Sequence, residues 1–120
     1  KVFIMEYDHN VSVDELERTH KEAYRTIRKN FKGWIIILSR FSGGLSITLN
    51  EEIKRVEIIQ KTFEYAKKNG DRCIAFYNGS KLFGDNKEGY FVDKVHPNDD
   101  GMTAIANMIY TLIQEEGMLD

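Results

Sequence analysis

Three short runs of apolar residues predict three β-strands. The first covers residues 1–7, where Val2-Phe3-Ile4-Met5 is followed by the polar break Asp8-His9-Asn10, and we expect it to be a buried core strand. The second covers residues 34–39 and does not alternate between apolar and polar positions. Such a run is typical of a central strand in a parallel sheet, which is covered on both faces. The third strand is expected at residues 73–77.

Between these runs, apolar residues recur at helical spacing and predict three helices. We expect Ser12, Asn50 and Asn98 to be the N-caps, and Gly33, Asn69-Gly70 and Gly117 to end the helices. Residues 45–50 are expected to be coil. The expected buried faces are Val13, Leu16, His20, Ala23, Tyr24, Ile27 and Phe31 in the first helix, Ile53, Val56, Ile59, Phe63 and Ala66 in the second, and Met102, Ile105, Ala106, Ile109, Leu112 and Ile113 in the third.

The alternation of strands and helices predicts an α/β fold with a parallel sheet of about three strands in a three-layer α/β/α arrangement. Residues 1–120 are expected to form a single domain that is incomplete at its N-terminus. In such sheets the functional site lies beyond the carboxyl ends of the strands, which directs attention to residues 8–10, 39–40 and 78–97. With three strands, one flank of the first strand has no partner. We expect this flank to pair with a separate N-terminal segment of the same enzyme or with a swapped second copy.

Composition excludes several classes of function. The chain of 120 residues has 17 Lys and Arg against 19 Asp and Glu, a net charge of −2, which argues against a nucleic-acid partner. The longest strictly apolar run, residues 34–38, is far shorter than the roughly 20 residues of a membrane span, so no membrane partner is expected. One cysteine, Cys73, excludes an internal disulfide and leaves secretion open. We expect a cytoplasmic location.

The most informative chemical pattern is Asp93 followed three residues later by His96 and Pro97. A histidine that acts as a general base needs a group on Nδ1 that fixes its tautomer, and a carboxylate three residues upstream in a tight loop can reach it. Pro97 biases His96 away from the helical region, and Asn98 can then cap the next helix. The alternative is a solvated loop in which His96 is only a residue before proline.

This stretch, residues 92–98 with Gly101 and the helix after it, resembles the last sequence block of SGNH (GDSL-type) hydrolases, in which Asp-x-x-His-Pro carries two members of the catalytic triad. Residues 7–10 look like a variant of the block that supplies an oxyanion-hole asparagine. Residues 38–40 and 82–84 are similar to segments of a bacterial subgroup. The resemblance covers essentially the whole chain, laid on the C-terminal part of that fold.

The resemblance implies a serine esterase or acylhydrolase that acts on carboxylic esters, with carbohydrate acetyl esters as one substrate class. It implies that His96 is the general base, Asp93 its orienting carboxylate and Asn10 an oxyanion donor. No cofactor and no metal are implied. The rival hypothesis, from a different class, is a non-catalytic α/β binding or assembly module in which these residues only hold loops together.

Two departures from the family pattern matter. The family has a glycine two residues before the oxyanion asparagine, where this chain has Asp8. The nucleophile normally lies in Gly-Asp-Ser after the first strand, and this motif does not occur in the chain. Ser42 beside Gly43-Gly44 is the only tempting substitute, although a glycine-rich turn explains it better. We therefore expect the nucleophile to lie before Lys1 and the chain alone to be inactive.

Three further interpretations remain open. His20 lies on an apolar helix face, which is more typical of a core or boundary histidine than of a functional one. Arg40, at the end of a strand, is expected either to contact substrate or to pair with a surface carboxylate. A mixed metal site is a weaker alternative, and its ligands would be Asp8, His9, Asp93 and His96.

Overall fold

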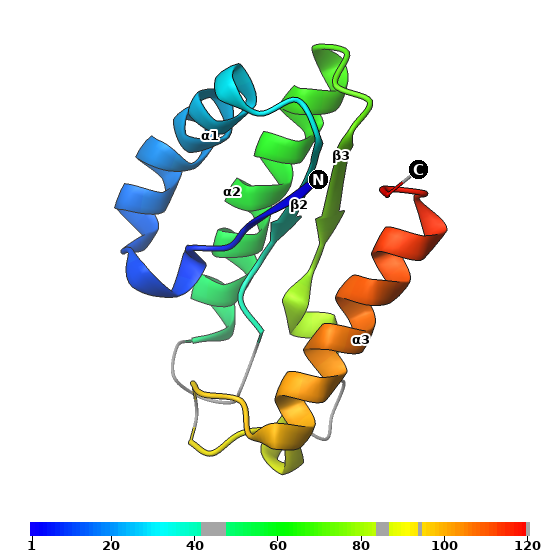
Figure 1. The fold of residues 1–120 in the computed structure, drawn as a ribbon. Coiled ribbons are helices and arrows are strands. Elements are labelled where there is room, and N and C mark those ends of the chain that lie inside the picture. Colours follow the sequence, from blue (N-terminus) through cyan, green and yellow to red (C-terminus); the bar gives the residue numbers. More distant parts are fainter. Residues whose placement is uncertain (42–47, 84–86, 94, 120) are drawn as a thin grey trace.

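The structure, a computed structural model, describes residues 1–41, 48–83, 87–93 and 95–119. Its sheet has the order β1-β2-β3, with both pairs parallel. Helices α1 and α2 cover one face and α3 covers the other (Figure 1), so the expected three-layer α/β fold is confirmed. The strands and long helices are β1 (Val2–Met5), α1 (Val13–Asn30), β2 (Trp34–Leu38), α2 (Leu49–Lys68), β3 (Ile74–Tyr77) and α3 (Asp99–Glu115).

Strand β2 lies at the centre of the fold. Ile35 and Ile37 belong to the core cluster beneath α1 and α2, whereas Ile36 and Leu38 belong to the cluster that contains Met108 of α3. All four strand side chains are almost completely buried. The apolar run does not alternate because both faces of this strand are covered.

Strand β1 is an edge strand. Met5 is buried, but Phe3 and Ile4 are 39% and 44% exposed, so the expectation of a core strand is wrong for these two residues. The physical reason is that β2 pairs with one flank of β1, and within the described residues no strand pairs with the other. The unpaired flank of β1 is the one expected from the sequence.

The first half of α2 differs from its prediction. The helix begins after Thr48, whose Oγ1 accepts the Glu51 N–H at 3.1 Å, and not after Asn50. Leu49 and Asn50 are therefore helical rather than coil. Ile53, expected inside, is exposed. The helix is rotated relative to the predicted face, because two polar residues, Arg55 and Thr62, lie on its inward side. The other two buried residues of this side are Ile59 and Ala66.

The ends and faces of α1 and α3 follow the sequence more closely. Ser12 and Asn98 are the N-caps, and the expected face of α1 is buried or partly buried. In α3, Met102 and Ala106 are exposed instead of buried, and Met108 faces the core. None of the described helices has both the length and the apolar character needed to cross a membrane.

Arg28 joins the elements at the amino edge of the sheet. Its guanidinium pairs with the Asp71 carboxylate at 2.9 Å and donates to the carbonyls of Phe31, Gly33 and Cys73 at 2.7–3.0 Å. Burial acts to raise the pKa of Asp71, but hydrogen bonds from the Tyr24 hydroxyl, the Cys73 N–H and Arg28 hold that pKa below its usual value. The end of α1 is thus fixed to the starts of β2 and β3.

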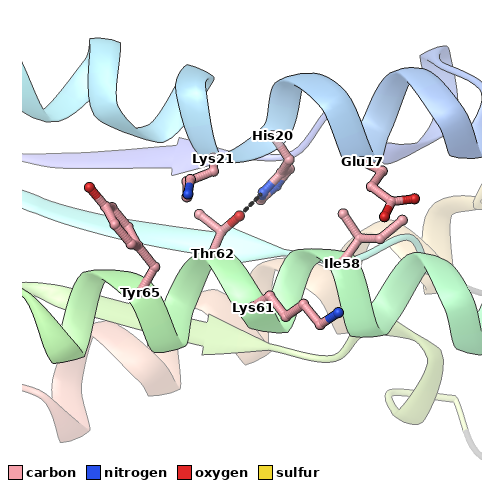
Figure 2. A pocket seen from close by; sticks show the side chains of 7 residues that line it. All are labelled: Glu17, His20, Lys21, Ile58, Lys61, Thr62 and Tyr65. Atoms are coloured by element: carbon pink, nitrogen blue, oxygen red, sulfur yellow. Dashed lines mark hydrogen bonds between the residues drawn. The ribbon is translucent and has the colours of Figure 1, made fainter.

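A pocket of about 250 Å³ lies between α1 and α2, with Glu17, Lys21 and Lys61 among its lining residues (Figure 2). His20 also lines this pocket but is only 2% exposed, and its Nδ1 shares a 2.7 Å hydrogen bond with Thr62 Oγ1. Its ring stacks on Tyr7. Burial lowers the pKa of His20 to about 4, so this side chain is a neutral core histidine at neutral pH.

His20 should make the fold sensitive to mild acid. Because its pKa is about 4 in the folded chain and 6.5 ordinarily, its stabilising effect is complete above pH 6.5 and is lost as the pH falls toward 4, by up to about 1.4 kcal/mol per pH unit. Urea unfolding across this interval should give a steeper loss of stability for the native chain than for His20→Gln. Equal slopes in the two proteins would contradict a buried neutral His20.

Candidate active site

The loops that follow the three strands lie at one edge of the sheet. The turn η1 (Asp8–Asn10) follows β1, Ser39 and Arg40 follow β2, and η2 (Gly79–Lys81) follows β3. The turn η3 (Lys87–Tyr90) and the segment that enters α3 lie at the same edge, which is the lower end of the molecule in Figure 1. Parallel strands bring these segments together because all their carboxyl ends point the same way.

Asp93 and His96 form one hydrogen-bonded turn. Asp93 Oδ2 lies 2.8 Å from His96 Nδ1, and Oδ1 accepts the backbone N–H groups of Val95 and His96 at 2.7 and 2.6 Å. The Val92 N–H donates to the His96 carbonyl, and Phe91 bridges to Pro97 in antiparallel fashion, which closes the turn. The pair is therefore oriented by its own local backbone.

Hydrogen bonding keeps the Asp93 carboxylate ionised. Donation from the His96 backbone N–H, then from its ring, and then from the Val95 N–H lowers the pKa of Asp93 to about 2. An ionised carboxylate on Nδ1 selects the tautomer with the proton on that nitrogen and leaves the Nε2 lone pair free to accept a proton. The turn thus has the arrangement that a general base requires.

The start of α3 holds this turn in place. Asn98 caps the helix, because its Oδ1 accepts the Gly101 N–H, and its Nδ2 donates to the Gly89 carbonyl. Its backbone N–H donates to the Tyr90 carbonyl at 2.8 Å. Gly101 passes so close to Tyr90 that an added Cβ would lie 2.2 Å from the Tyr90 carbonyl oxygen. Only glycine fits at this position.

His96 and Asn10 line the same groove, although they come from opposite ends of the chain. The groove has a volume of about 520 Å³ and lies between β1, the end of β2 and α3. Asn10 and the side chain of His96 are both exposed to solvent and are two of its polar lining residues. Its apolar lining comes from Ile4, Leu38, Phe41, Val95, Pro97, Met102, Ile105 and Ile109.

Glu6 also lines this groove, and the sequence analysis did not single it out. Partial burial raises the pKa of Glu6, and the nearby Asp8 charge raises it further. The sequence feature that could have identified Glu6 is its position directly after β1, at the carboxyl edge of the sheet.

Asp8 is not available to bind a metal in the arrangement that the structure shows. Its side chain is completely buried and pairs with Arg55 of α2 at 3.0 Å, and it also accepts the Arg40 N–H at 2.8 Å. The described residues contain no group of three or more His, Cys, Asp or Glu side chains placed to hold a metal ion. The side chain of His9 lies outside those described.

Arg40 is buried, and its charge acts to lower the pKa of the nearby Glu6 carboxyl. Arg55 was missed because a cation was not expected on the inward face of α2. Its spacing of four residues from buried Ile59 on the same helix face was the signal that could have found it.

Ser39 connects the ends of β2 and β3, and Ser80 makes a local contact after β3. The Ser39 hydroxyl donates to Asn78 Oδ1 at 3.1 Å and accepts the Gly79 N–H at 2.9 Å, and the Ser80 hydroxyl donates to the same Asn78 oxygen. Ser12 caps α1. Ser42, the tempting substitute nucleophile, lies outside the described residues, as does Ser46.

The acidity of Asp93 can be separated into ring and backbone contributions. We expect carbon-detected NMR to give a pKa of about 2 for Asp93 in the native chain. His96→Ala removes the ring donor but keeps both backbone donors, so the pKa should rise and still remain below the ordinary 3.8. A pKa that does not move in this variant would contradict the side-chain hydrogen bond.

A comparison with models of protein families matched residues 1–114 to the GDSL-like lipase/acylhydrolase family. Comparisons with curated proteins and with solved structures gave no match. The family match covers both the strand that precedes Asn10 and the segment that carries Asp93 and His96. The chain belongs to the GDSL-like lipase/acylhydrolase family and is an SGNH/GDSL-type hydrolase chain.

Proposed function

We propose that this chain supplies the Asp93–His96 pair and the oxyanion donor Asn10 for the hydrolysis of carboxylic esters. The observation that carries the proposal is the 2.8 Å hydrogen bond between Asp93 and His96, together with the groove that both His96 and Asn10 line. The family match supports ester bonds as the target. Carbohydrate acetyl esters are the substrate class proposed from the family resemblance.

Each residue has a defined part in this reaction. His96 Nε2 takes the proton from a serine hydroxyl as its oxygen attacks the ester carbonyl, and it then gives that proton to the leaving alcohol. Asp93 stabilises the imidazolium through Nδ1. The Asn10 side-chain amide donates to the oxyanion of the tetrahedral intermediate. Water, activated by the same histidine, then releases the acid from the acyl-serine.

The proposed nucleophile is a serine on a strand that pairs with the open flank of β1. Two observations support this part of the proposal: the chain contains no Gly-Asp-Ser, and within the described residues β1 is an edge strand with Phe3 and Ile4 exposed. A strand parallel to β1 would end at the edge where Asn10 and His96 lie. The proposed source is an N-terminal segment of the same enzyme, and a swapped second copy is the alternative.

Activity measurements can test these roles with p-nitrophenyl acetate. We expect residues 1–120 alone to be inactive, and an enzyme that also carries an upstream Gly-Asp-Ser segment from the same gene to be active. In that enzyme His96→Ala should lower kcat by roughly 10⁴-fold and Asn10→Ala by roughly 10²–10³-fold. Glu64→Gln, on the exposed side of α2, is the matched control and should leave kcat unchanged.

The outcomes separate the alternatives. Full activity of His96→Ala in the longer enzyme would overturn the assignment of the base. Turnover by residues 1–120 alone that disappears in His96→Ala would place the nucleophile inside this chain. If the gene encodes no Gly-Asp-Ser segment and no preparation is active, the non-catalytic binding or assembly module becomes the better description.

Pairing of β1 can be measured independently of activity. In the enzyme with the upstream segment, amides of residues 2–6 should exchange slowly with deuterium, as should those of buried β2. In a swapped dimer of residues 1–120, the same protection should appear together with a doubled mass in sedimentation. A monomeric enzyme in which residues 2–6 all exchange rapidly would contradict a partner for this flank.

A further inference from the structure

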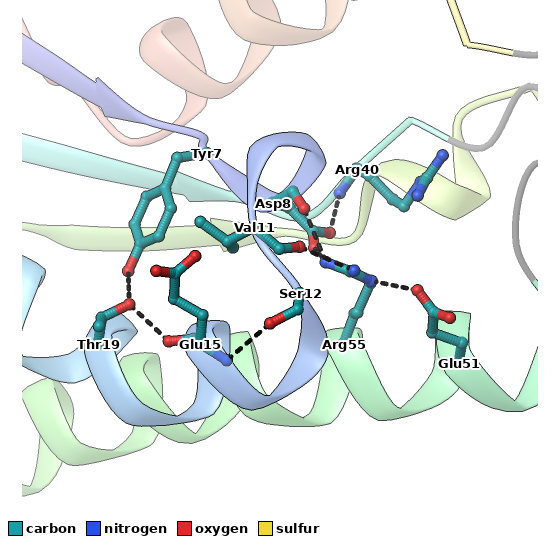
Figure 3. A network of polar contacts seen from close by, with 9 residues as sticks. All are labelled: Tyr7, Asp8, Val11, Ser12, Glu15, Thr19, Arg40, Glu51 and Arg55. Atoms are coloured by element: carbon teal, nitrogen blue, oxygen red, sulfur yellow. Dashed lines mark hydrogen bonds and ion pairs between the residues drawn. The ribbon is translucent and has the colours of Figure 1, made fainter.

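The carboxyl edge contains a buried ion pair that the proposed mechanism does not use. The side chains of Asp8 and Arg55 are 0% and 7% exposed, and Arg55 Nη1 lies 3.0 Å from Asp8 Oδ1 (Figure 3). Burying two charges is costly unless their geometry is good and their remaining hydrogen-bonding capacity is satisfied. We therefore consider which segments of the chain this ion pair holds in place.

The Arg55 guanidinium contacts both ends of the η1 turn. Nη1 donates to the Asp8 carbonyl at 2.7 Å as well as to the Asp8 carboxylate, and Nη2 donates to the Val11 carbonyl at 2.9 Å. Nε donates to Glu51, which fixes the guanidinium plane on α2. Arg55 thus contacts residues that come before and after Asn10 in the sequence, Asp8 and Val11, both of which are drawn in Figure 3.

Asp8 connects the same turn to the end of β2. Its second oxygen accepts the Arg40 N–H at 2.8 Å, so the carboxylate bridges α2 and β2. The turn itself is short: η1 covers three residues, the Asn10 N–H donates to the Tyr7 carbonyl at 3.1 Å, and Val11 is extended. Contacts from α2 and from the end of β2 are therefore added to the two ends of this short turn.

We propose that Arg55 and Asp8 are positioning residues that hold Asn10 in the direction required to donate to the oxyanion. The inference rests on the proposed function, because Asn10 is the group that they position. Arginine is required because its planar fork contacts two carbonyls and a carboxylate at once, whereas the lysine ammonium is a single point donor. The alternative is an ion pair that contributes to folding only.

Arg28 provides a matched control. It is also partly buried, pairs with an aspartate and donates to backbone carbonyls, but it lies at the amino edge of the sheet, away from Asn10. Arg28→Lys and Arg55→Lys make the same chemical change at opposite edges. Any general effect of loosening a buried arginine should appear in both variants.

The first measurement is NMR of residues 1–120 and needs no activity. In the native chain the Asn10 backbone order parameter should be about 0.85, as for rigid backbone, and in Arg55→Lys it should fall below about 0.6. Asp8→Asn should change it in the same direction, and Arg28→Lys should leave it unchanged. A mobile Asn10 in the native chain, or a rigid one in folded Arg55→Lys, would overturn the proposal even if one variant failed to fold.

The second measurement is kinetic and uses the enzyme with the upstream segment. Because a misplacement of about 1 Å can cost on the order of 10²-fold, Arg55→Lys should lower kcat by that order with little change in KM. Combining it with Asn10→Ala should lower kcat no further than Asn10→Ala alone. Additive losses, or equal losses in Arg28→Lys, would show a structural role only. If no preparation is active, the proposed function fails while the NMR result still decides the positioning.

Discussion

The burial of β2 on both faces is the constraint on which the rest of the structure depends. Ile35 and Ile37 pack beneath α1 and α2, and Ile36 and Leu38 pack toward α3, so helices are required on both sides of the sheet. With β1 and β3 paired to its two flanks in parallel, all strand ends that carry polar loops point to one edge. The location of the candidate site follows from this pairing.

Two buried or partly buried arginines fix the opposite edges of that sheet. Arg28 connects α1 to the starts of β2 and β3, and Arg55 connects α2 to the turn after β1. In both cases a guanidinium donates to several backbone carbonyls in the segments where the chain enters or leaves the strands. The apolar core positions the layers, whereas these polar contacts determine how the chain enters and leaves the strands.

The candidate site combines a part that folds locally with a part that does not. Asp93 and His96 meet within one turn through side-chain and backbone hydrogen bonds. Asn10 reaches the same groove only because β1 and α3 are brought together across the fold. In the proposed function the serine comes from a third place, beside the open flank of β1, so the reacting groups would be assembled by strand pairing.

The sequence by itself determined the α/β class, the three strands, the caps Ser12 and Asn98 and the pairing of Asp93 with His96, because each depends on residues close together in the chain. It did not determine the rotation of α2, the exposure of Phe3 and Ile4 or the ion pair between Asp8 and Arg55. Local spacing leaves a polar residue on an apolar face unexplained until its distant partner is known. Only the tertiary structure decided these features, because burial and ion pairing depend on which elements pack side by side.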